Sequence, residues 1–416
     1  MPAPPLPTSP GFWRSPLRGP RFTSVLGLVL LVGITVVFVT GLVSYAAYNP
    51  DLSPVNDKTP GKGILGFYLF AWPTDPHWLY RLTQGVHVTL GITLIPVLLA
   101  KLWSVVPRLF ALPPARSLAH ALERISLLLL VGGGLFEFVT GVLNIQLDYV
   151  FPGSFYPLHF YGAWVFFAAF VAHAALKTPA AVRNVRRLRG EGDEEGHEAG
   201  DLVSPRPDAP TVSRRGALWF VGGGSLLLFA TTVGQGFDGP LRRTALLAPH
   251  GGADPGSGPN GFQINKTAAY AGIDAARTSE DAWRLVVTGR TGTVRLSRAQ
   301  LARLPLYSSA LPIACVEGWS TSDQWWRGVR LRDLAALVGH DDDPPDLLVE
   351  SLQRRGAFRH AALRANQVAD PRSLLALYVN GEDLSPDHGY PARVIVPAAP
   401  GVLNTKWVAR MTFGDL

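Results

Sequence analysis

The chain has 416 residues, of which 47% are hydrophobic and only 17% are charged. Its formal net charge of +7 comes from 38 Lys and Arg against 31 Asp and Glu. The basic residues form short runs beside apolar segments, a pattern typical of membrane-flanking loops and unlike a nucleic-acid-binding surface. The composition therefore predicts membrane spans and two or three domains, and it excludes nucleic acid as a partner.

Five apolar segments are each long enough to cross a hydrocarbon core of about 30 Å. Lys and Arg gather in the N-terminal tail and in the second and fourth connections, whereas the first connection carries Lys58 and Lys62 and the third carries neither type. The positive-inside rule then places the N-terminus in the cytoplasm and the C-terminal part outside. We expect a multi-pass protein of the cytoplasmic membrane. The segments run approximately over residues 23–45, 79–103, 124–147, 155–176 and 216–232.

Three histidines lie inside these segments, where ionisable residues are costly and usually mark function. His87 belongs to the second segment, and His159 and His173 belong to the fourth. The latter two are almost four helical turns apart, so both project from one helix face at a separation of roughly 21 Å.

Stacked b-type haems use this arrangement, and the segments loosely resemble short bacterial membrane cytochromes b. We predict one or two haems b, with His87 and His159 as the easier pair of iron ligands and no evident partner for His173. The alternative is that some of these histidines are polar residues satisfied between helices.

The fourth connection, residues 178–215, is charged and poor in large apolar residues, which predicts a disordered cytoplasmic linker. It ends in Arg214 and Arg215 before the last apolar segment. This pair resembles an internal twin-arginine translocation signal, and it also fits the positive flank of a membrane span. The expected domains are a tail (1–22), a four-helix haem b domain (23–177), the linker, a fifth helix (216–235) and an extracytoplasmic domain (236–416).

The last 180 or so residues differ in sequence pattern from the apolar segments before them. "WRLVVTGRTGTVRLS" predicts two short strands around a Gly-containing turn, and "GVRLRDLAALVG" predicts a strand that leads into a helix. "DLLVESLQ", "LLALYVNGEDL" and "ARVIVPA" indicate further strands. The predicted fold is thus an all-α transmembrane bundle of five helices followed by an α+β domain.

This last part also contains the only cysteine of the chain, Cys315, in "LPIACVEGWS". A lone cysteine cannot form an intrachain disulfide or supply the paired thiols of a c-type haem. It is either a small buried core residue or a ligand or nucleophile.

Three segments, taken together and in order, resemble the molybdopterin-binding domain of the sulfite oxidase superfamily. They are "IACVEGWS", "LLALYVNGEDLSPDHGYPARVIVP" and "NTKWVARMTF", and the resemblance covers residues 260–413. It implies that the Cys315 thiolate binds molybdenum beside one pyranopterin. A soft thiolate suits such a metal centre.

The resemblance carries over to further residues. His388 and Arg393 match the pterin-contacting histidine and arginine, and an arginine can donate two parallel hydrogen bonds to the cofactor phosphate. Asn404, Thr405 and Lys406 match the segment that closes over the cofactor. Each residue alone could be an ordinary structural or surface residue, and only their joint occurrence in motif order favours the site.

Two positions indicate the branch of this superfamily. Asn265 stands where sulfite oxidases have an arginine-bearing segment, and Glu317 follows Cys315 by two residues. Both features resemble the bacterial periplasmic branch that includes the catalytic subunit of protein-methionine-sulfoxide reductase. Glu317 would then act with Cys315 in catalysis as a proton relay, or it is a structural hydrogen-bond acceptor.

We therefore expect a membrane-bound molybdenum oxidoreductase that transfers oxygen atoms outside the membrane and receives electrons through haem from quinone or another redox partner. The expected substrates are small-molecule or protein-bound S- or N-oxides such as methionine sulfoxide. One alternative is a sulfite or sulfur-compound dehydrogenase that feeds electrons inward. The other is a cofactor-free membrane protein that transfers electrons or binds a partner.

Overall fold

The computed structural model describes residues 6–52, 55–56, 70–110, 112, 117–145, 155–186, 204, 206–248, 256–355 and 358–416. The chain divides into two compact units. The first is formed by Met1–Val39 and Val88–Thr232, and the second by Thr40–His87 and Val233–Leu416. The division passes through the first two long helices, so the second unit includes one end of each.

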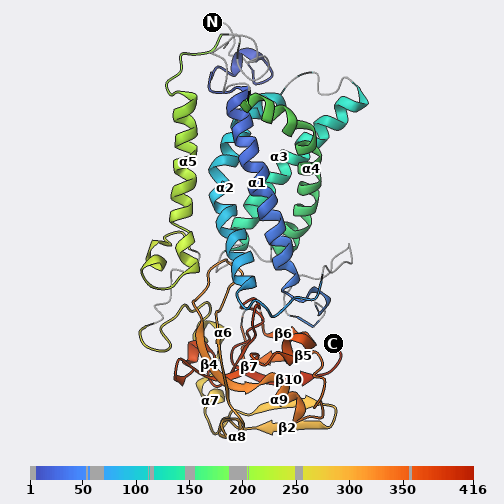
Figure 1. Ribbon diagram of the computed structural model, residues 1–416, viewed down its shortest axis with the longest axis vertical. Helices are drawn as coiled ribbons and strands as arrows, with labels where there is room; N and C mark the ends of the chain where they lie inside the picture. Colours follow the sequence, from blue (N-terminus) through green and yellow to red (C-terminus); the bar gives the residue numbers. More distant parts are fainter. Residues whose placement is uncertain are drawn as a thin grey trace. The chain divides into compact units, whose positions relative to one another are not determined.

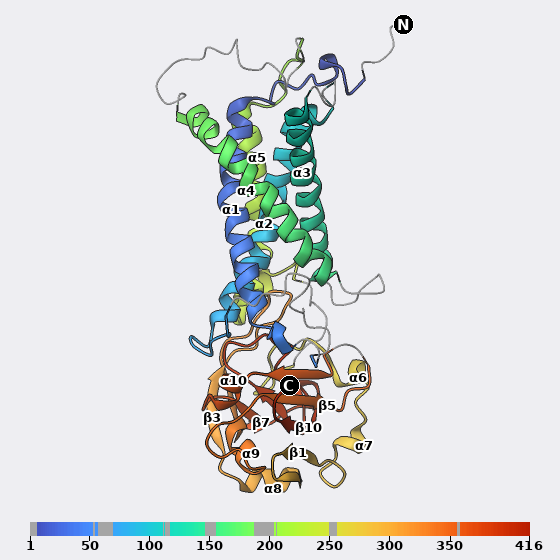
Figure 2. The ribbon, with the colours of Figure 1, turned by 90° about the vertical axis from the view of Figure 1, so that its right-hand side faces the viewer.

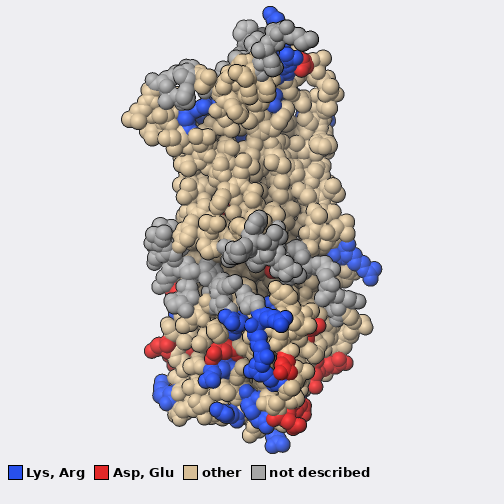
Figure 3. All heavy atoms as spheres, turned by 180° about the vertical axis from the view of Figure 1, so that it is seen from behind, with Lys and Arg blue, Asp and Glu red and all other residues tan. Residues whose placement is uncertain are grey.

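Five long helices are apolar enough to cross a membrane by length and composition (Figure 1), which confirms the five predicted apolar segments. On the face shown in Figure 3, a broad band of the helical region carries no Lys, Arg, Asp or Glu. Helix α4 continues into the predicted linker, most of which lies outside the described residues. The helices are α1 (Pro20–Ala46), α2 (Leu79–Leu109), α3 (Leu118–Asn144), α4 (Tyr156–Arg186) and α5 (Arg214–Ala230).

Glycines allow close helix packing in the first unit. Helices α3 and α4 run side by side (Figures 1 and 2), and a Cβ at Gly133 would lie only 3.2 Å from Cβ of Phe166. Small residues let helix backbones approach in this way. His159 and His173 both lie on α4, so the predicted spacing on one helix is confirmed.

The second unit contains two sheets joined by short helices. The first sheet has the order β2-β1-β10-β5-β6, with β1 and β10 parallel and the other pairs antiparallel. Strands β5 and β10 lie side by side in both Figure 1 and Figure 2. These strands are β1 (Leu285–Gly289), β2 (Gly292–Leu296), β5 (Leu347–Ser351), β6 (His360–Leu363) and β10 (Val408–Phe413).

The second sheet is antiparallel and follows the order β3-β4-β7-β8, with β9 also paired to β7. Along β4 buried and exposed residues alternate from Gln324 to Gly328, as the period of two in a strand requires. The strands are β3 (Tyr307–Leu311), β4 (Gln324–Arg330), β7 (Leu374–Val379), β8 (Glu382–Asp383) and β9 (Arg393–Ile395).

The predicted strands and the predicted strand-to-helix step are all present. "GVRLRDLAALVG" ends β4 and continues into α9 (Leu331–Ala336), and "RAQLARL" contains α8 (Arg298–Arg303). The other short helices are α6 (Ala268–Ala271), α7 (Ala275–Thr278) and α10 (Ala365–Ala369). The C-terminal part is thus an α/β domain with sheets.

The connection between α1 and α2 is bound to this domain. Asn49 is fully buried and donates through Nδ2 to Ala362 O (3.1 Å) and Gln367 Oε1 (2.8 Å). Trp72 Nε1 donates to Ala398 O (2.7 Å). The domain was expected to begin at residue 236, and no local pattern indicates that a segment more than 150 residues earlier packs in it.

One glycine tests the pairing of β4 with β7. A Cβ at Gly328 would lie 2.0 Å from Leu375 O and 2.6 Å from Ala376 Cα, which are backbone atoms that cannot rotate away. We expect Gly328→Ala to lower the free energy of unfolding by about 1–3 kcal/mol or more, because overpacking forces the strands apart. Thermal unfolding of the purified chain measures this change. Gly222→Ala, where a Cβ would meet nothing within 4 Å, is the control, and equal melting of both variants would contradict the packing described.

Candidate functional site

Cys315 lies in a tight turn between β3 and β4. Its backbone N–H donates to Trp319 O (2.8 Å), and Gly318 N–H donates to Cys315 O (3.1 Å). Gly318 has a φ of +90°, a conformation that glycine adopts without steric cost. The side chain of Cys315 is buried in an apolar cluster with Phe262, Trp319 and Trp326. We call residues 315–320 the Cys315 loop.

The surroundings of Cys315 favour a protonated thiol. Burial raises the pKa of the Cys315 thiol well above its ordinary value, and the charge and hydrogen bond of Glu317 raise it further. A bound metal ion would reverse this effect, because a coordinating thiol loses its proton. Glu317 is therefore near the thiol, as the sequence led us to expect.

Two buried cations belong to the same cluster. Arg393, on β9, is 4% exposed, and burial lowers its pKa to about 9, while the nearby Cys315 acts to raise it. Burial also lowers the pKa of Lys406 well below its ordinary value, and repulsion from Arg393 and Lys266 adds to this. Buried cations of this kind need an anion or a dense set of acceptors.

The acceptors around Lys406 are uncharged oxygens, which offset its buried positive charge only in part. Its Nζ donates to Asn265 Oδ1 (3.1 Å) and to the backbone oxygens of Asp387 (2.9 Å) and Lys266. The Nζ also lies 4.6 Å from the ring centre of Trp407. Two of the three oxygens come from the neighbouring residues Asn265 and Lys266 and the third from Asp387, so Lys406 joins the predicted closing segment to Asn265.

His388 is a neutral ring at this site. It stacks on Phe262 with ring centres 3.8 Å apart, and its Nε2 lies 2.9 Å from Asn260 O, so Nε2 carries the proton. Burial lowers the pKa of His388 to about 3, with repulsion from Arg393 as the next cause. His388 O in turn accepts a hydrogen bond from Arg393 (3.3 Å).

Several buried polar side-chain atoms find no hydrogen-bond partner in the part of the chain that the structure describes, and three of them belong to the predicted cofactor-binding residues. These three are Arg393 Nε, Asn404 Nδ2 and Thr405 Oγ1. The other amide atom of Asn404 accepts from Val396 N–H (2.9 Å), which fixes its side chain. Buried polar atoms without partners are rare and need an explanation. Together with the two cations, they fit a polar, negatively charged ligand.

Gly389 allows these elements to meet. It ends the short 3-10 helix Pro386–His388 with a φ of +114°. A Cβ there would lie 3.1 Å from Lys406 Cβ and 3.3 Å from Arg393 Cβ. A side chain at this position would therefore push both cations away from His388.

The predicted residues of the molybdenum site all belong to the second unit. Contacts or charge interactions join Cys315 to Glu317, Arg393 and Lys406, and Lys406 to Asn265. His87 also belongs to this unit, whereas His159 and His173 belong to the first, so the pairing of these histidines stays a prediction. Within the described residues no three His, Cys, Asp or Glu side chains gather as a metal site, so any metal would rely on few protein ligands.

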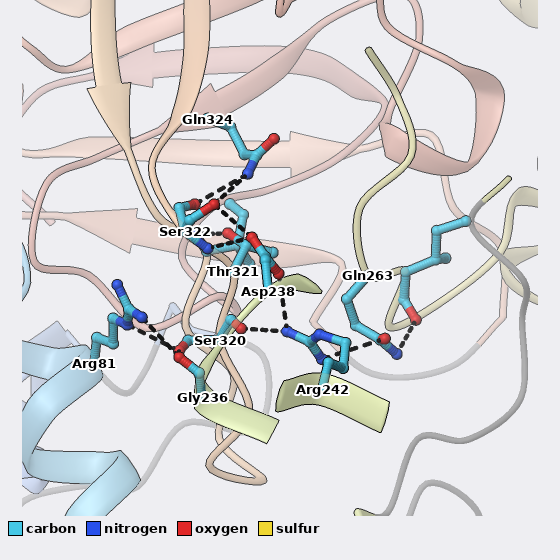
Figure 4. Close-up of polar contacts among 11 residues, drawn as sticks. Arg81, Gly236, Asp238, Arg242, Gln263, Ser320, Thr321, Ser322 and Gln324 are labelled. Carbon is cyan, nitrogen blue, oxygen red and sulfur yellow. Dashed lines mark hydrogen bonds and ion pairs between the residues drawn. The ribbon is translucent and has the colours of Figure 1, made fainter. Parts of the chain in front are cut away.

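Sequence reasoning missed a second group of polar residues around Ser320 (Figure 4). Arg81 donates to Ser320 Oγ (3.0 Å) and Gly236 O (2.7 Å), and Arg242 donates to Ser320 O. Asp238 accepts from Ser322 N–H (2.7 Å). Arg81 begins an apolar helix and Arg242 lies in a short basic stretch, so neither carries a local signal of this contact.

His159 is held by two neighbours on α3. Its Nδ1 lies 3.2 Å from Glu137 Oε2 and 3.0 Å from Thr140 Oγ1. A Cβ at Gly141 would lie 3.3 Å from the ring, so the glycine leaves room for the imidazole. The ring is therefore oriented by a carboxylate and a hydroxyl.

The chain was compared with known proteins. The profile of the family described as "Oxidoreductase molybdopterin binding domain" matches residues 272–415, a range that includes Cys315, His388, Arg393 and Lys406 but not Asn265. Mitochondrial sulfite oxidase of Homo sapiens is 31% identical over 158 residues, which are 32% of this chain and 29% of that protein. The uncharacterized oxidoreductase YuiH of Bacillus subtilis is 32% identical over 132 residues, which are 32% of this chain and 65% of that protein.

The matched relatives are thus covered over less than two thirds of their length. Among solved structures, the sulfane dehydrogenase SoxCD of Paracoccus pantotrophus is 24% identical, with coverage of 32% of this chain and 39% of that one. Its TM-score of 0.29 is too low to bear on the fold or the activity.

The neutral His388 predicts an acid sensitivity. Its pKa is about 3 in the folded chain against an ordinary value of 6.5, so the unfolded chain binds a proton between these pH values that the folded chain does not. The free energy of unfolding should then fall as the pH drops from 6.5 toward 3, by at most about 1.4 kcal/mol per pH unit. Unfolding midpoints of the wild type and His388→Gln between pH 7.5 and 4.5 measure this slope.

The His388→Gln variant should lose the part of the pH dependence of unfolding that comes from His388. His360→Gln, at an exposed histidine on β6, is the matched control and should keep the wild-type behaviour. Identical slopes for wild type and His388→Gln would show that His388 is not the group responsible.

Proposed function

We propose that this chain, whose residues 272–415 form an oxidoreductase molybdopterin-binding domain of the sulfite oxidase family, is a membrane-bound enzyme that transfers oxygen atoms with electrons supplied through b-type haem. The observation that carries the proposal is the Cys315 thiol, buried in one cluster with Arg393 and Lys406. The active domain lies outside the cytoplasmic membrane. The five apolar helices and the distribution of Lys and Arg support this location.

The residues present fit a molybdopterin cofactor. Cys315 would bind the metal, and Arg393 and Lys406 would offset the negative charge of the phosphate. Asn404 Nδ2 and Thr405 Oγ1 would pair with polar atoms of the pterin, which accounts for their lack of partners among the described residues. When bound, molybdenum supplies the two-electron chemistry of oxygen-atom transfer.

Glu317 bears on the substrate. A carboxylate so near Cys315 repels a dianion such as sulfite and leaves a neutral S- or N-oxide unopposed. Reduction of such an oxide consumes two protons, and Glu317 would relay them as a general acid. Methionine sulfoxide, free or in a protein, is the proposed substrate class. The reductant is a quinol or another redox partner.

A second candidate is oxidation of sulfite or another sulfur compound, with electrons fed inward. The human relative, which is named a sulfite oxidase, favours it. The two directions differ in a spectroscopic test: an S-oxide should oxidise the reduced haem in one case, and sulfite should reduce the oxidised haem in the other. A third candidate, a cofactor-free protein that only transfers electrons or binds a partner, requires purified protein without molybdenum.

His87, His159 and His173 are the proposed haem ligands. The contact of His159 Nδ1 with Glu137 supports ligation through the other ring nitrogen, because ligand histidines are commonly oriented by a carboxylate.

Elemental analysis tests the molybdenum site. Protein purified in detergent should contain about one molybdenum per chain, since one cysteine can hold only one such centre. Cys315→Ser should lose the metal. Glu317→Gln is the control: it should keep the molybdenum and lose turnover by roughly 100-fold or more, as expected for a general acid. A wild type without molybdenum, from a host that makes the cofactor, would refute the proposal.

The haem ligands can be tested independently. The iron content should distinguish one haem from two, and His159→Ala should remove the absorbance of a haem with two histidine ligands. Glu137→Gln should keep the haem and raise its midpoint potential, because a less basic imidazole stabilises ferric iron less. His120→Ala, in the first turn of α3, should keep both the haem and the potential. Full haem content in His159→Ala would remove this histidine from the ligands.

A further inference from the structure

We infer that the first turns of α2 link the haem to the molybdenum site, with Gln84 and Arg81 as positioning residues that hold the Cys315 loop against the helix that carries His87. This inference rests on the proposed function, because it assigns a route to the electrons which that function requires. The residues involved all belong to the second unit, and a hydrogen bond joins the helix directly to the loop.

Gln84 makes the direct contact. Its Nε2 donates to the backbone oxygen of Val316 at 2.5 Å, and Val316 is the neighbour of Cys315 in the chain. Gly85 lies beside it: a Cβ there would come 4.0 Å from Gly318 O, so the helix lies directly against the loop. One side-chain hydrogen bond and one residue therefore separate α2 from the predicted metal ligand.

Arg81 fixes the other end of the loop (Figure 4). Its guanidinium donates to Ser320 Oγ (3.0 Å) and to Gly236 O (2.7 Å), while Ser320 N–H donates to Gln235 O (3.1 Å). Ser320 is 2% exposed and pairs with Ala314 in a β-bridge. Arg81 and Gln84 thus bind the Cys315 loop near both of its ends, at Ser320 and Val316.

This contact is part of a fully packed region. Tyr80 of α2 is completely buried and shares an apolar cluster with Tyr48, Trp72 and Ala314, the residue before Cys315. The Tyr48 and Tyr80 hydroxyls are 2.8 Å apart, and Ser44 donates to Thr83 at 2.9 Å. Because the side chains around it are buried and packed, the orientation of Gln84 is fixed. A contact between two exposed side chains would leave it mobile.

His87 completes the route. It follows Gln84 by three residues, a spacing that places both side chains on neighbouring positions of one helix face. Its ring lies against α1: a Cβ at Gly41 would come 2.6 Å from His87 Cε1, so only a glycine fits there. From His87 to Cys315 the route consists of one helical turn, the Gln84 hydrogen bond and Val316.

The two half-reactions of the proposed cycle exchange equal numbers of electrons and protons. A quinol gives up two electrons and two protons and becomes a quinone, and an S-oxide takes up two electrons and two protons and becomes a sulfide and water. A haem held by His87 would supply one-electron chemistry, so the two electrons would reach the Cys315 site singly. The route through Gln84 concerns only this passage of single electrons.

The test separates delivery of electrons from chemistry at the metal. The reduced protein is mixed rapidly with methionine sulfoxide, and reoxidation of the haem is followed by its absorbance. Turnover is measured separately with a reduced viologen, a small soluble reductant that can reach the metal without the haem. Molybdenum and haem contents are measured for every variant.

Gln84→Leu should slow the reoxidation of the haem several-fold, while molybdenum content, haem content and viologen-driven turnover stay at the wild-type level. Gln84→Asn keeps the amide but is one methylene shorter, so it should show the same defect with less effect on packing. Thr93→Val is the matched control, because Thr93 Oγ1 bonds only within α2, to Thr89 O (2.7 Å). It should react like the wild type.

Two results would overturn the inference. One is haem reoxidation at the wild-type rate in both Gln84 variants. The other is a parallel loss of viologen-driven turnover or of molybdenum, which would make Gln84 a structural residue of the loop. A wild type without haem or molybdenum would instead refute the proposed function itself, and this is visible before any variant is made.

Discussion

The burial of Arg393 and Lys406 beside Cys315 is the constraint on which the site depends. A cation removed from water is costly unless acceptors or an anion surround it. Among the described residues Lys406 donates to an amide and two backbone oxygens, and burial lowers the pKa of both cations. Such an arrangement is stable when a phosphate-bearing ligand offsets the charge.

The topology explains how the two cations come together. Arg393 lies on β9 in the second sheet, whereas Lys406 lies two residues before β10, an inner strand of the first sheet. Backbone hydrogen bonds from Val394 to Thr405 (2.9 Å) and from Val408 to Ala392 (3.0 Å) join the segments. The site therefore sits where the chain crosses from one sheet to the other, and both sheets hold it rigid.

Motif order predicted much of this site, and local periodicity predicted many of the strands. The structure places Asn265, Glu317, Arg393 and Lys406 with Cys315 in one unit, although their chemical roles stay predictions. Strands β3, β6 and β10 were not recognised; "HAAL" in β6, for example, has no β-branched residue.

The attachment of Thr40–His87 to the domain could not be predicted either. Asn49 and Gln84 find partners more than 200 residues away, and contacts at that separation leave no pattern in the local sequence. A single asparagine or glutamine also has many uses, so its type alone gives no clue to its partner.

The contact between α2 and the Cys315 loop is small, and it is stable because both parts belong to one chain. The three hydrogen bonds of Arg81 and Gln84 would contribute on the order of 1 kcal/mol each, or about 3 kcal/mol together, which corresponds to a dissociation constant of several millimolar. Two separate proteins at micromolar concentration would not be held together by it. Within one chain the two parts are tethered and cannot diffuse apart, and the buried cluster around Tyr80 adds to the hydrogen bonds that keep the loop on the helix. Fusion into one chain thus allows a small contact to join α2 and the Cys315 loop, the two parts that the proposed electron route requires.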